Sequence, residues 1–157
     1  MNKLVIRVYT VADLEQIINL HNIALEATGA HVGNGHWDRD LWDIENIYLK
    51  NNGTFLIGSL QGQIVAMGAL RRISEEMGEI KRMRVLPQFQ RQGFGQAILT
   101  ALETDAAKRG YKLLCLDTTV LQVASQKMYL KNGYTETKRT KEGFPFETIF
   151  YEKRLSA

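Results

Sequence analysis

EIKRMRVLPQFQRQGFGQ, residues 79–96, is the stretch of sequence that decides the fold. Residues 79–86 alternate in part between apolar and polar side chains, and Pro87 ends this strand because proline has no backbone N–H to donate. From Phe94 the apolar residues follow helical spacing as far as Gly110, at Ala97, Ile98, Ala101, Leu102 and Ala106. The stretch therefore predicts a strand, a glycine-containing turn and a helix in direct succession.

The turn, residues 90–96, is an unusual start for a helix. Helix starts favour Ser, Thr, Asp or Asn as the cap, whereas this one has Arg91, Gly93 and Gly95. A glycine inside a helix costs about 1 kcal/mol relative to alanine. One explanation is an anionic ligand, whose phosphates approach the free N–H groups of the first helical turn. For the two glycines taken alone, an ordinary glycine-containing turn is the favoured explanation.

Two well-known phosphate-binding loops are excluded by inspection. No Lys-Ser or Lys-Thr pair follows the glycines, as a P-loop requires. Ile98 occupies the position at which a dinucleotide-binding fingerprint has its third glycine.

The turn resembles the acetyl-coenzyme A signature of the GNAT superfamily of N-acetyltransferases, Arg/Gln-x-x-Gly-x-Gly/Ala, which Gln90, Gly93 and Gly95 match. The strand at residues 79–85 resembles the cofactor strand of that family, and ASQKMYLKNGY, residues 124–134, resembles its tyrosine helix. The resemblance implies acetyl-CoA as cosubstrate, bound through the turn, through the backbone of the strand, and through Gln122, where an asparagine is common. The implied cofactor-binding residues are Met83, Arg84, Val85, Gln90, Arg91, Gln92, Gly93, Phe94, Gly95, Gln96 and Gln122.

Acetyl transfer to an amine needs a neutral nitrogen, a place for negative charge on the carbonyl oxygen, and a proton for the leaving thiolate. The resemblance implies that Glu79 is the general base, directly or through water, and that Tyr129 protonates the thiolate. Both residues have a simpler interpretation. Glu79 also suits an exposed strand carboxylate beside Lys81 and Arg82, and Tyr129 a core residue of its helix.

The whole chain sets limits on the class of protein. Its 157 residues, 45% of them hydrophobic, predict one domain over residues 1–157. The net charge of +3 comes without long basic blocks, so we expect no nucleic-acid partner. Residues 3–8 predict a short strand where a secretory signal would have its long apolar segment, and no stretch reaches the length of a membrane span. We expect a cytoplasmic protein without a membrane partner, as a monomer or a homodimer.

Two further features bear on chemistry. Cys115 lies in an apolar run, which favours a core thiol over a nucleophile and provides no disulfide within the chain. Residues 28–38 contain three glycines together with His31, His36 and Trp37, a composition that fits a substrate-binding loop or a disordered connection. The two histidines are five residues apart without other ligands at metal-site spacing, so we expect no metal.

The remaining elements follow from their periodicity. Strands are predicted at residues 3–8, 54–60, 63–71, 111–118, 134–139 and 146–155, and helices at 13–27, from Leu41 to Asn52-Gly53, and from about Gln122 to Asn132. The predicted fold is α/β, with a mixed, mostly antiparallel sheet of about seven strands and helices on both faces, as in GNAT-like acyl-CoA N-acyltransferases.

The predicted function is transfer of the acetyl group of acetyl-CoA to a primary amine of a small molecule or peptide. The alternative is a catalytically silent acyl-CoA-binding or regulatory module on the same fold, because a fold does not fix a chemistry. A nucleic-acid-binding protein is a third hypothesis, which strong salt-dependent DNA binding would support.

Overall fold

The structure, a computed structural model, describes residues 3–31, 33, 36–142 and 145–155. The strands are β1 (Val5–Val8), β2 (Thr54–Leu60), β3 (Gln63–Arg72), β4 (Met77–Val85), β5 (Leu113–Thr119), β6 (Thr135–Thr140) and β7 (Thr148–Arg154). The helices are α1 (Leu14–Ala27), α2 (Phe94–Lys108) and α3 (Val123–Lys131), with short helical turns at Val11–Asp13 (η1), His36–Trp42 (η2), Glu45–Leu49 (η3) and Pro87–Phe89 (η4).

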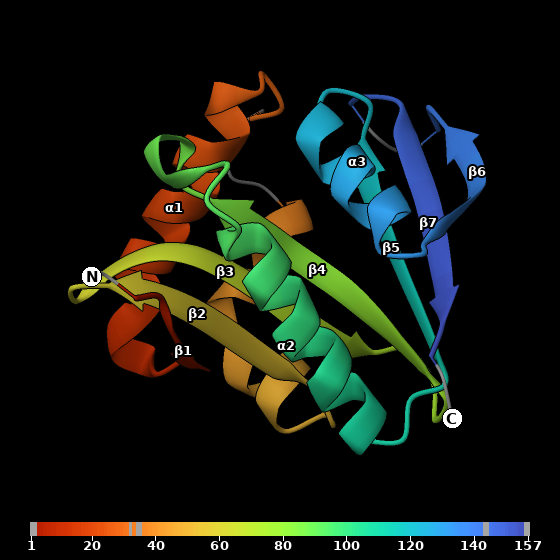
Figure 1. Cartoon of the computed structure of the whole chain (residues 1–157), viewed down its shortest axis with the longest axis horizontal. Coiled ribbons are helices and arrows are strands. Elements are labelled where there is room, and N and C mark those ends of the chain that lie inside the picture. The colour runs from red at the N-terminus through yellow and green to blue at the C-terminus, as the bar shows by residue number, and fades with distance from the viewer. Residues whose placement is uncertain (1–2, 32, 34–35, 143–144, 156–157) are drawn as a thin grey trace.

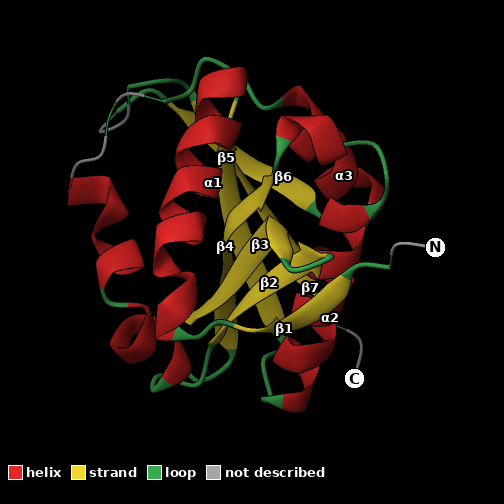
Figure 2. Cartoon of the chain, turned by 90° about the vertical axis from the view of Figure 1, so that its left-hand side faces the viewer, coloured by secondary structure: helices red, strands yellow, loops and turns green. Residues whose placement is uncertain are grey.

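All seven strands form one sheet in the order β1-β2-β3-β4-β5-β7-β6. Only β4 and β5 run parallel; every other neighbouring pair is antiparallel. α1 covers one face of the sheet, and α2 and α3 cover the other (Figures 1 and 2). The predicted fold class is confirmed. None of the helices among the described residues is long and apolar enough to cross a membrane.

Side chains from both helical layers meet the sheet in the core. The largest fully buried side chains include Ile17, Leu20, Phe55, Met67, Ile98 and Leu102. The helical spacing of the predicted α1 and α2 thus places their apolar faces against the sheet, and burial of such side chains contributes roughly 1.5–3 kcal/mol each.

The predicted helix from Leu41 to Asn52-Gly53 is wrong in its form. The chain instead makes the 3₁₀ turn η2 and the π-helical turn η3. The apolar face was predicted correctly, because Leu41, Ile44 and Tyr48 are all buried. The backbone departs from a regular helix where the carboxylate of Asp40 is bound by Tyr48 and by Arg82 of β4. These tertiary contacts outweigh the local preference for a continuous α-helix.

A bulge in β4 sets up the functional region. Met67 pairs with Arg84 and Ala69 pairs with Lys81, so Gly68 of β3 faces two residues of β4. Arg82, within the bulge, has φ of +59°. No side chain fits at Gly68, since a Cβ there would lie 2.5 Å from the sulfur of Met83. The bulge bends β4 at this point.

β4 and β5 consequently pair over only part of their length. Their pairing covers only Met77–Glu79 of β4 with Leu113–Cys115 of β5. Beyond Glu79 the two strands diverge, as Figure 1 shows. The edge of β4 from Ile80 to Val85 therefore faces a gap in the sheet, with backbone groups that no neighbouring strand pairs on that side.

The start of the first helix provides a test of pH-dependent stability. The carboxylate of Asp13 accepts a 2.8 Å hydrogen bond from the backbone N–H of Thr10 and two from Arg7, at 2.7 and 2.8 Å. The hydrogen bond from Arg7 is the main reason that the pKa of Asp13 falls to about 2. A lowered carboxyl pKa stabilises the folded state above the unfolded pKa, and this contribution disappears as the pH falls through the folded pKa.

We expect Asp13→Asn to cost about 1–2 kcal/mol of unfolding free energy at neutral pH, a modest figure because Arg7 is half-exposed. The cost should stay constant down to about pH 4 and vanish towards pH 2 in urea unfolding. Glu15→Gln, an exposed carboxylate on the same helix, is the control and should show little effect. A cost that persists unchanged at pH 2 would contradict the role of the ionised carboxylate.

Candidate active site

Two adjoining cavities lie along the open edge of β4. The larger cavity has a volume of about 710 Å³ and lies between β4, β5, α3 and the segment after α1. The smaller cavity, about 380 Å³, lies between the end of β4 and the first turns of α2 and α3. Four residues line both: Met83, Arg84, Gln122 and Ser125. These residues mark the junction of the two cavities.

The smaller cavity contains the first turn of α2. Gly93 is the N-cap of the helix with φ of +83°, and no side chain caps the helix start. The N–H groups of the first turn therefore need partners from outside the helix. The backbone conformation explains why residue 93 is a glycine, because a positive φ favours glycine.

Gly95 has a different explanation. A Cβ at this position would lie 3.6 Å from both the Met128 sulfur and Val85 Cγ2, which is ordinary contact. The fold therefore does not require a glycine at residue 95. A glycine there leaves the backbone accessible to a ligand, and N–H groups at a helix start favour negative charge. This arrangement fits the phosphates of coenzyme A.

The predicted turn residues are almost all at this cavity. Its lining includes Gln90, Arg91, Gly93, Phe94, Gly95 and Gln96, while Gln92 is exposed outside the lining. Gln90 donates a hydrogen bond to the Val85 carbonyl at 3.2 Å. Gln96 exchanges two amide hydrogen bonds with Asn132, at 2.7 and 2.9 Å. These two side chains hold the turn to β4 and to α3, so the ligand-facing groups of the turn are mainly backbone N–H groups.

The predicted strand residues lie where the cavities meet. Met83 and Arg84 line both cavities and Val85 lines the smaller one. Since β5 has left β4 by this point, an extended ligand can pair with the β4 backbone as an added strand.

Two glutamines shape the turn between β5 and α3. Gln122 Oε1 accepts hydrogen bonds from Thr118 Oγ1 at 3.0 Å, Thr119 Oγ1 at 3.2 Å and Thr119 N at 3.3 Å. Gln126 donates to the carbonyls of Thr119 and Val120, at 3.2 and 3.1 Å. Both glutamines therefore stabilise this turn. Within the described residues the Gln122 amide nitrogen has no hydrogen-bond partner, so it is available to a ligand.

Tyr129 lines the larger cavity although only 4% of it is exposed. Its ring packs against Tyr134 and Tyr151, with centroids 5.7 and 6.1 Å away. Burial raises the pKa of the Tyr129 hydroxyl well above its usual value. The phenol is therefore protonated at neutral pH and can act as a proton donor. The core and the acid interpretations of Tyr129 are thus compatible.

Three carboxylates line the larger cavity: Asp38, which is bound by Arg82 and His21, together with Glu79 and Asp117. Glu79 lies 2.7 Å from the guanidinium of Arg71, its cross-strand neighbour, and its side chain is 12% exposed. Asp117, at the end of β5, was not predicted from the sequence as a site residue. The pKa of its carboxyl is raised by partial desolvation and then by the Glu79 carboxylate. The cavity thus offers a pair of acidic groups for an amine.

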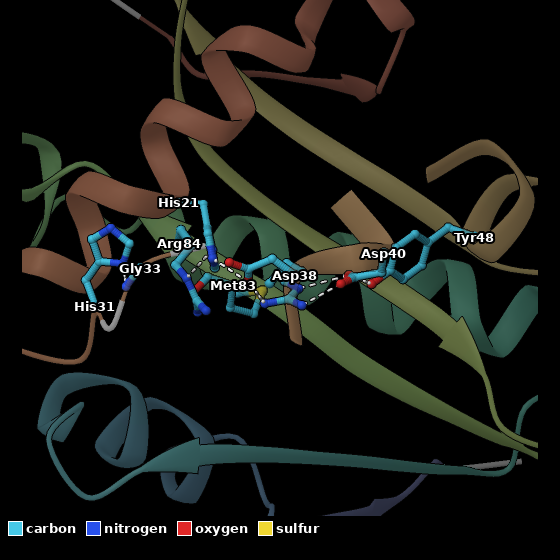
Figure 3. Close-up of polar contacts among 9 residues, drawn as sticks. His21, His31, Gly33, Asp38, Asp40, Tyr48, Met83 and Arg84 are labelled. Atoms are coloured by element: carbon cyan, nitrogen blue, oxygen red, sulfur yellow. Dashed lines mark hydrogen bonds and ion pairs between the residues drawn. The ribbon is translucent and has the colours of Figure 1, made fainter. Parts of the chain in front are cut away.

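A buried polar cluster, formed by His21, Asp38, Asp40, Tyr48 and Arg82, supports the cavity wall (Figure 3). Arg82 bonds to Asp40 at 2.9 and 2.5 Å and to Asp38 at 3.3 Å, and His21 Nε2 lies 3.0 Å from Asp38. The cluster joins α1 and η2 to the bulge, and its ion pairs hold Arg82 in the left-handed conformation. The sequence signals were a histidine on the apolar face of the first helix and the Asp-x-Asp of residues 38–40.

Cys115 and the predicted loop contribute differently to the cavity. Burial raises the pKa of the Cys115 thiol to about 11, so the thiolate is scarce at neutral pH. His31 lines the larger cavity, whereas the side chain of His36 lies outside the described residues. No three His, Cys, Asp or Glu side chains of the described part of the chain are placed to hold a metal ion.

Comparisons with known proteins match this geometry. The profile of the Acetyltransferase (GNAT) family matches residues 15–134. N-acetyltransferase family 8 member 3 of Mus musculus is 28% identical over 107 residues, which cover 64% of this chain and 47% of that protein. The chain thus spans about half the length of that curated relative.

Solved structures show the same fold. A GNAT-family acetyltransferase from Staphylococcus aureus Mu50 superposes with a TM-score of 0.90 at 21% identity, covering 98% of this chain and 100% of that one. The PaiA N-acetyltransferase of Thermoplasma acidophilum, in complex with coenzyme A, gives a TM-score of 0.77 at 18% identity, covering 98% of this chain and 99% of that one. With the family profile covering most of its length, the chain belongs to the acetyltransferase (GNAT) family.

Proposed function

We propose that the protein is an acetyl-CoA-dependent N-acetyltransferase that acts on a primary amine. The observation that carries the proposal is the junction at Met83 and Arg84 between two cavities. One has uncapped helix N–H groups, and the other has three carboxylates and a buried tyrosine. One cavity suits a phosphate-bearing cosubstrate and the other suits an amine. The acetyl group of the cosubstrate and the amine of the acceptor would meet at the open edge of β4.

The residues present fit acetyl-CoA. The uncapped start of α2 would hold the pyrophosphate, with Gly93 and Gly95 allowing close approach and Arg91 contributing positive charge. The unpaired β4 edge at Met83–Val85 would hold the pantetheine by main-chain hydrogen bonds. The coenzyme A complex of the PaiA enzyme, which shares the fold, supports this assignment. Bound there, acetyl-CoA supplies an acetyl group activated as a thioester.

Side chains of the protein would carry out the two proton transfers of the reaction. Glu79 and Asp117 line the larger cavity and would take a proton from the incoming ammonium group, directly or through water. Backbone groups at Met83–Val85 would hold the reacting carbonyl in place. The Tyr129 hydroxyl would deliver a proton to the leaving sulfur. Because burial raises the pKa of Tyr129, its hydroxyl stays protonated before the sulfur leaves.

Ligand binding and amine-dependent turnover together test the proposal. Acetyl-CoA at about 100 times its Kd should stabilise the folded protein by about 2.7 kcal/mol, seen as a higher Tm. A panel of primary amines should then release free coenzyme A thiol from acetyl-CoA. Stabilisation without turnover of any amine would instead identify a silent coenzyme A-binding module, and an unchanged Tm would refute the cofactor site.

A further inference from the structure

The guanidinium of Arg84 lies at the junction of the two cavities, and its hydrogen-bond partners among the described residues are neutral. Its Nη1 donates to the Met83 carbonyl at 2.8 Å, and its Nε donates to His21 Nδ1 at 3.3 Å. His21 is itself neutral, because burial and then the charge of Arg84 lower its pKa to about 3. Since Nδ1 accepts from Arg84, the proton of the ring is on Nε2, which faces Asp38. Asp38 and His21 thus orient Arg84, as Figure 3 shows.

Arg84 carries a charge that the protein does not neutralise by direct contact. Burial, and then repulsion from Arg82, lower the pKa of Arg84 to about 10, so the group is still protonated at neutral pH. Asp38 and Asp117 attract it only from beyond ion-pair distance: within the described residues no carboxylate oxygen lies within 4 Å of its nitrogens. A partly buried cation without a paired anion is costly. The guanidinium fork is therefore suited to an anionic group of a ligand.

That anion belongs to the acceptor. The proposed site of the coenzyme A phosphates is at the start of α2. The residues there that line only the smaller cavity are Gln90, Arg91, Gly93, Phe94, Gly95 and Gln96. Arg84 also lines the larger cavity, where Lys81 adds a second positive charge. Because Arg84 is at the junction, an anion bound to it must be close to the nitrogen that is acetylated.

The larger cavity supplies the remaining features of the acceptor. Glu79 and Asp117 offer negative charge for an ammonium group. Apolar wall comes from Leu25, Ala30, Pro145 and Phe146. Opposite charges that line one cavity beside an apolar wall suit a zwitterion with an apolar side chain.

We propose that the acceptor is a free α-amino acid with an apolar side chain, whose carboxylate binds Arg84 and whose amino group faces Glu79 and Asp117. The inference rests on the proposed acetyltransferase function and specifies its substrate class. Arg84 acts in it as a specificity-determining residue.

The decisive experiment compares an apolar α-amino acid with its own α-carboxamide, which keeps the amine and side chain but loses the negative charge. With coenzyme A present, the amino acid should raise the Tm of the wild-type protein and the amide should not. In turnover, Arg84→Gln should lower the ratio of kcat/KM for acid over amide about 10²-fold. Because each variant is tested with the same pair of compounds, the different basicity of the two amines cancels from the comparison.

Two variants serve as controls. Arg72→Gln makes the same change on an exposed residue outside both cavities and should leave the ratio unchanged. Arg84→Lys keeps the charge but loses the fork, and should give an intermediate ratio. If Arg84→Gln does not fold, the wild-type binding comparison alone decides.

Each outcome separates the inference from the proposed function. An equal fall in kcat for acid and amide would show that Arg84 serves the reaction itself, and would overturn its role in recognition. Turnover of other amines, without binding of any apolar amino acid, would overturn the inference and leave the acetyltransferase function standing. Absence of acetyl-CoA binding would remove the proposed function itself.

Discussion

Gly95→Glu should weaken acetyl-CoA binding by about 10³-fold or more while the protein remains folded. The added carboxylate would lie at the first turn of α2, where the phosphates are proposed to bind. Its side chain would fill space that the phosphates need, and its negative charge would repel them. The fold should tolerate the change because a Cβ at residue 95 meets only ordinary contacts, at 3.6 Å. Glutamate also suits a helix better than glycine does.

Isothermal titration of coenzyme A into the variant measures this effect, and far-UV circular dichroism verifies the fold. Thr104→Glu is the matched control, since it adds the same charge at an exposed position of the same helix, outside the cavity. Its affinity should equal that of the wild type. Normal binding by Gly95→Glu would place the anion site elsewhere in the molecule.

Tyr129→Phe should lower the rate of the chemical step by about 10²-fold or more and leave the affinity for acetyl-CoA nearly unchanged. The substitution removes one oxygen and keeps the ring, whose packing against Tyr134 and Tyr151 is the structural part of the role. A lower kcat with unaltered KM places the hydroxyl in the transition state, because an interaction made only there does not affect ground-state binding.

Tyr134→Phe separates catalysis from packing. The hydroxyl of Tyr134 donates to Glu103 at 2.7 Å and is not part of either cavity lining. This variant should lose some stability and keep its turnover. If Tyr129→Phe behaves like Tyr134→Phe in steady-state kinetics, the tyrosine has no acid role.

Much of the fold was predictable because its signals are local. Period-two patterns, one continuous apolar run at residues 111–118 and period-3.6 patterns predicted all seven strands and the three helices, with boundaries within a few residues. The second helix was predicted wrongly at 41–53, because its backbone is bent by contacts with Arg82, which is about forty residues away in the chain. Local periodicity carries no information about such a partner.

The phosphate turn was visible for the same local reason. Gly93 and Gly95 follow a strand and open a helix, and these are all neighbours in sequence. The sequence could not show that a glycine is present at the two positions for different reasons. The positive φ at Gly93 and the ordinary contacts around Gly95 depend on how α2 packs against α3 and β4.

The sequence by itself determined the order of the elements, the apolar faces of the helices, the turn that begins α2, and the placement of Tyr129 on the helix after β5. Only the tertiary structure decided how β4 and β5 separate, that Asp117 lies in the same cavity as Glu79, and that His21 and Asp38 orient Arg84. The physical reason is how far apart in the chain the interacting residues lie. The periodicity of helices and strands is read from residues a few positions apart, whereas the polar groups of the site come from four elements that only folding brings together.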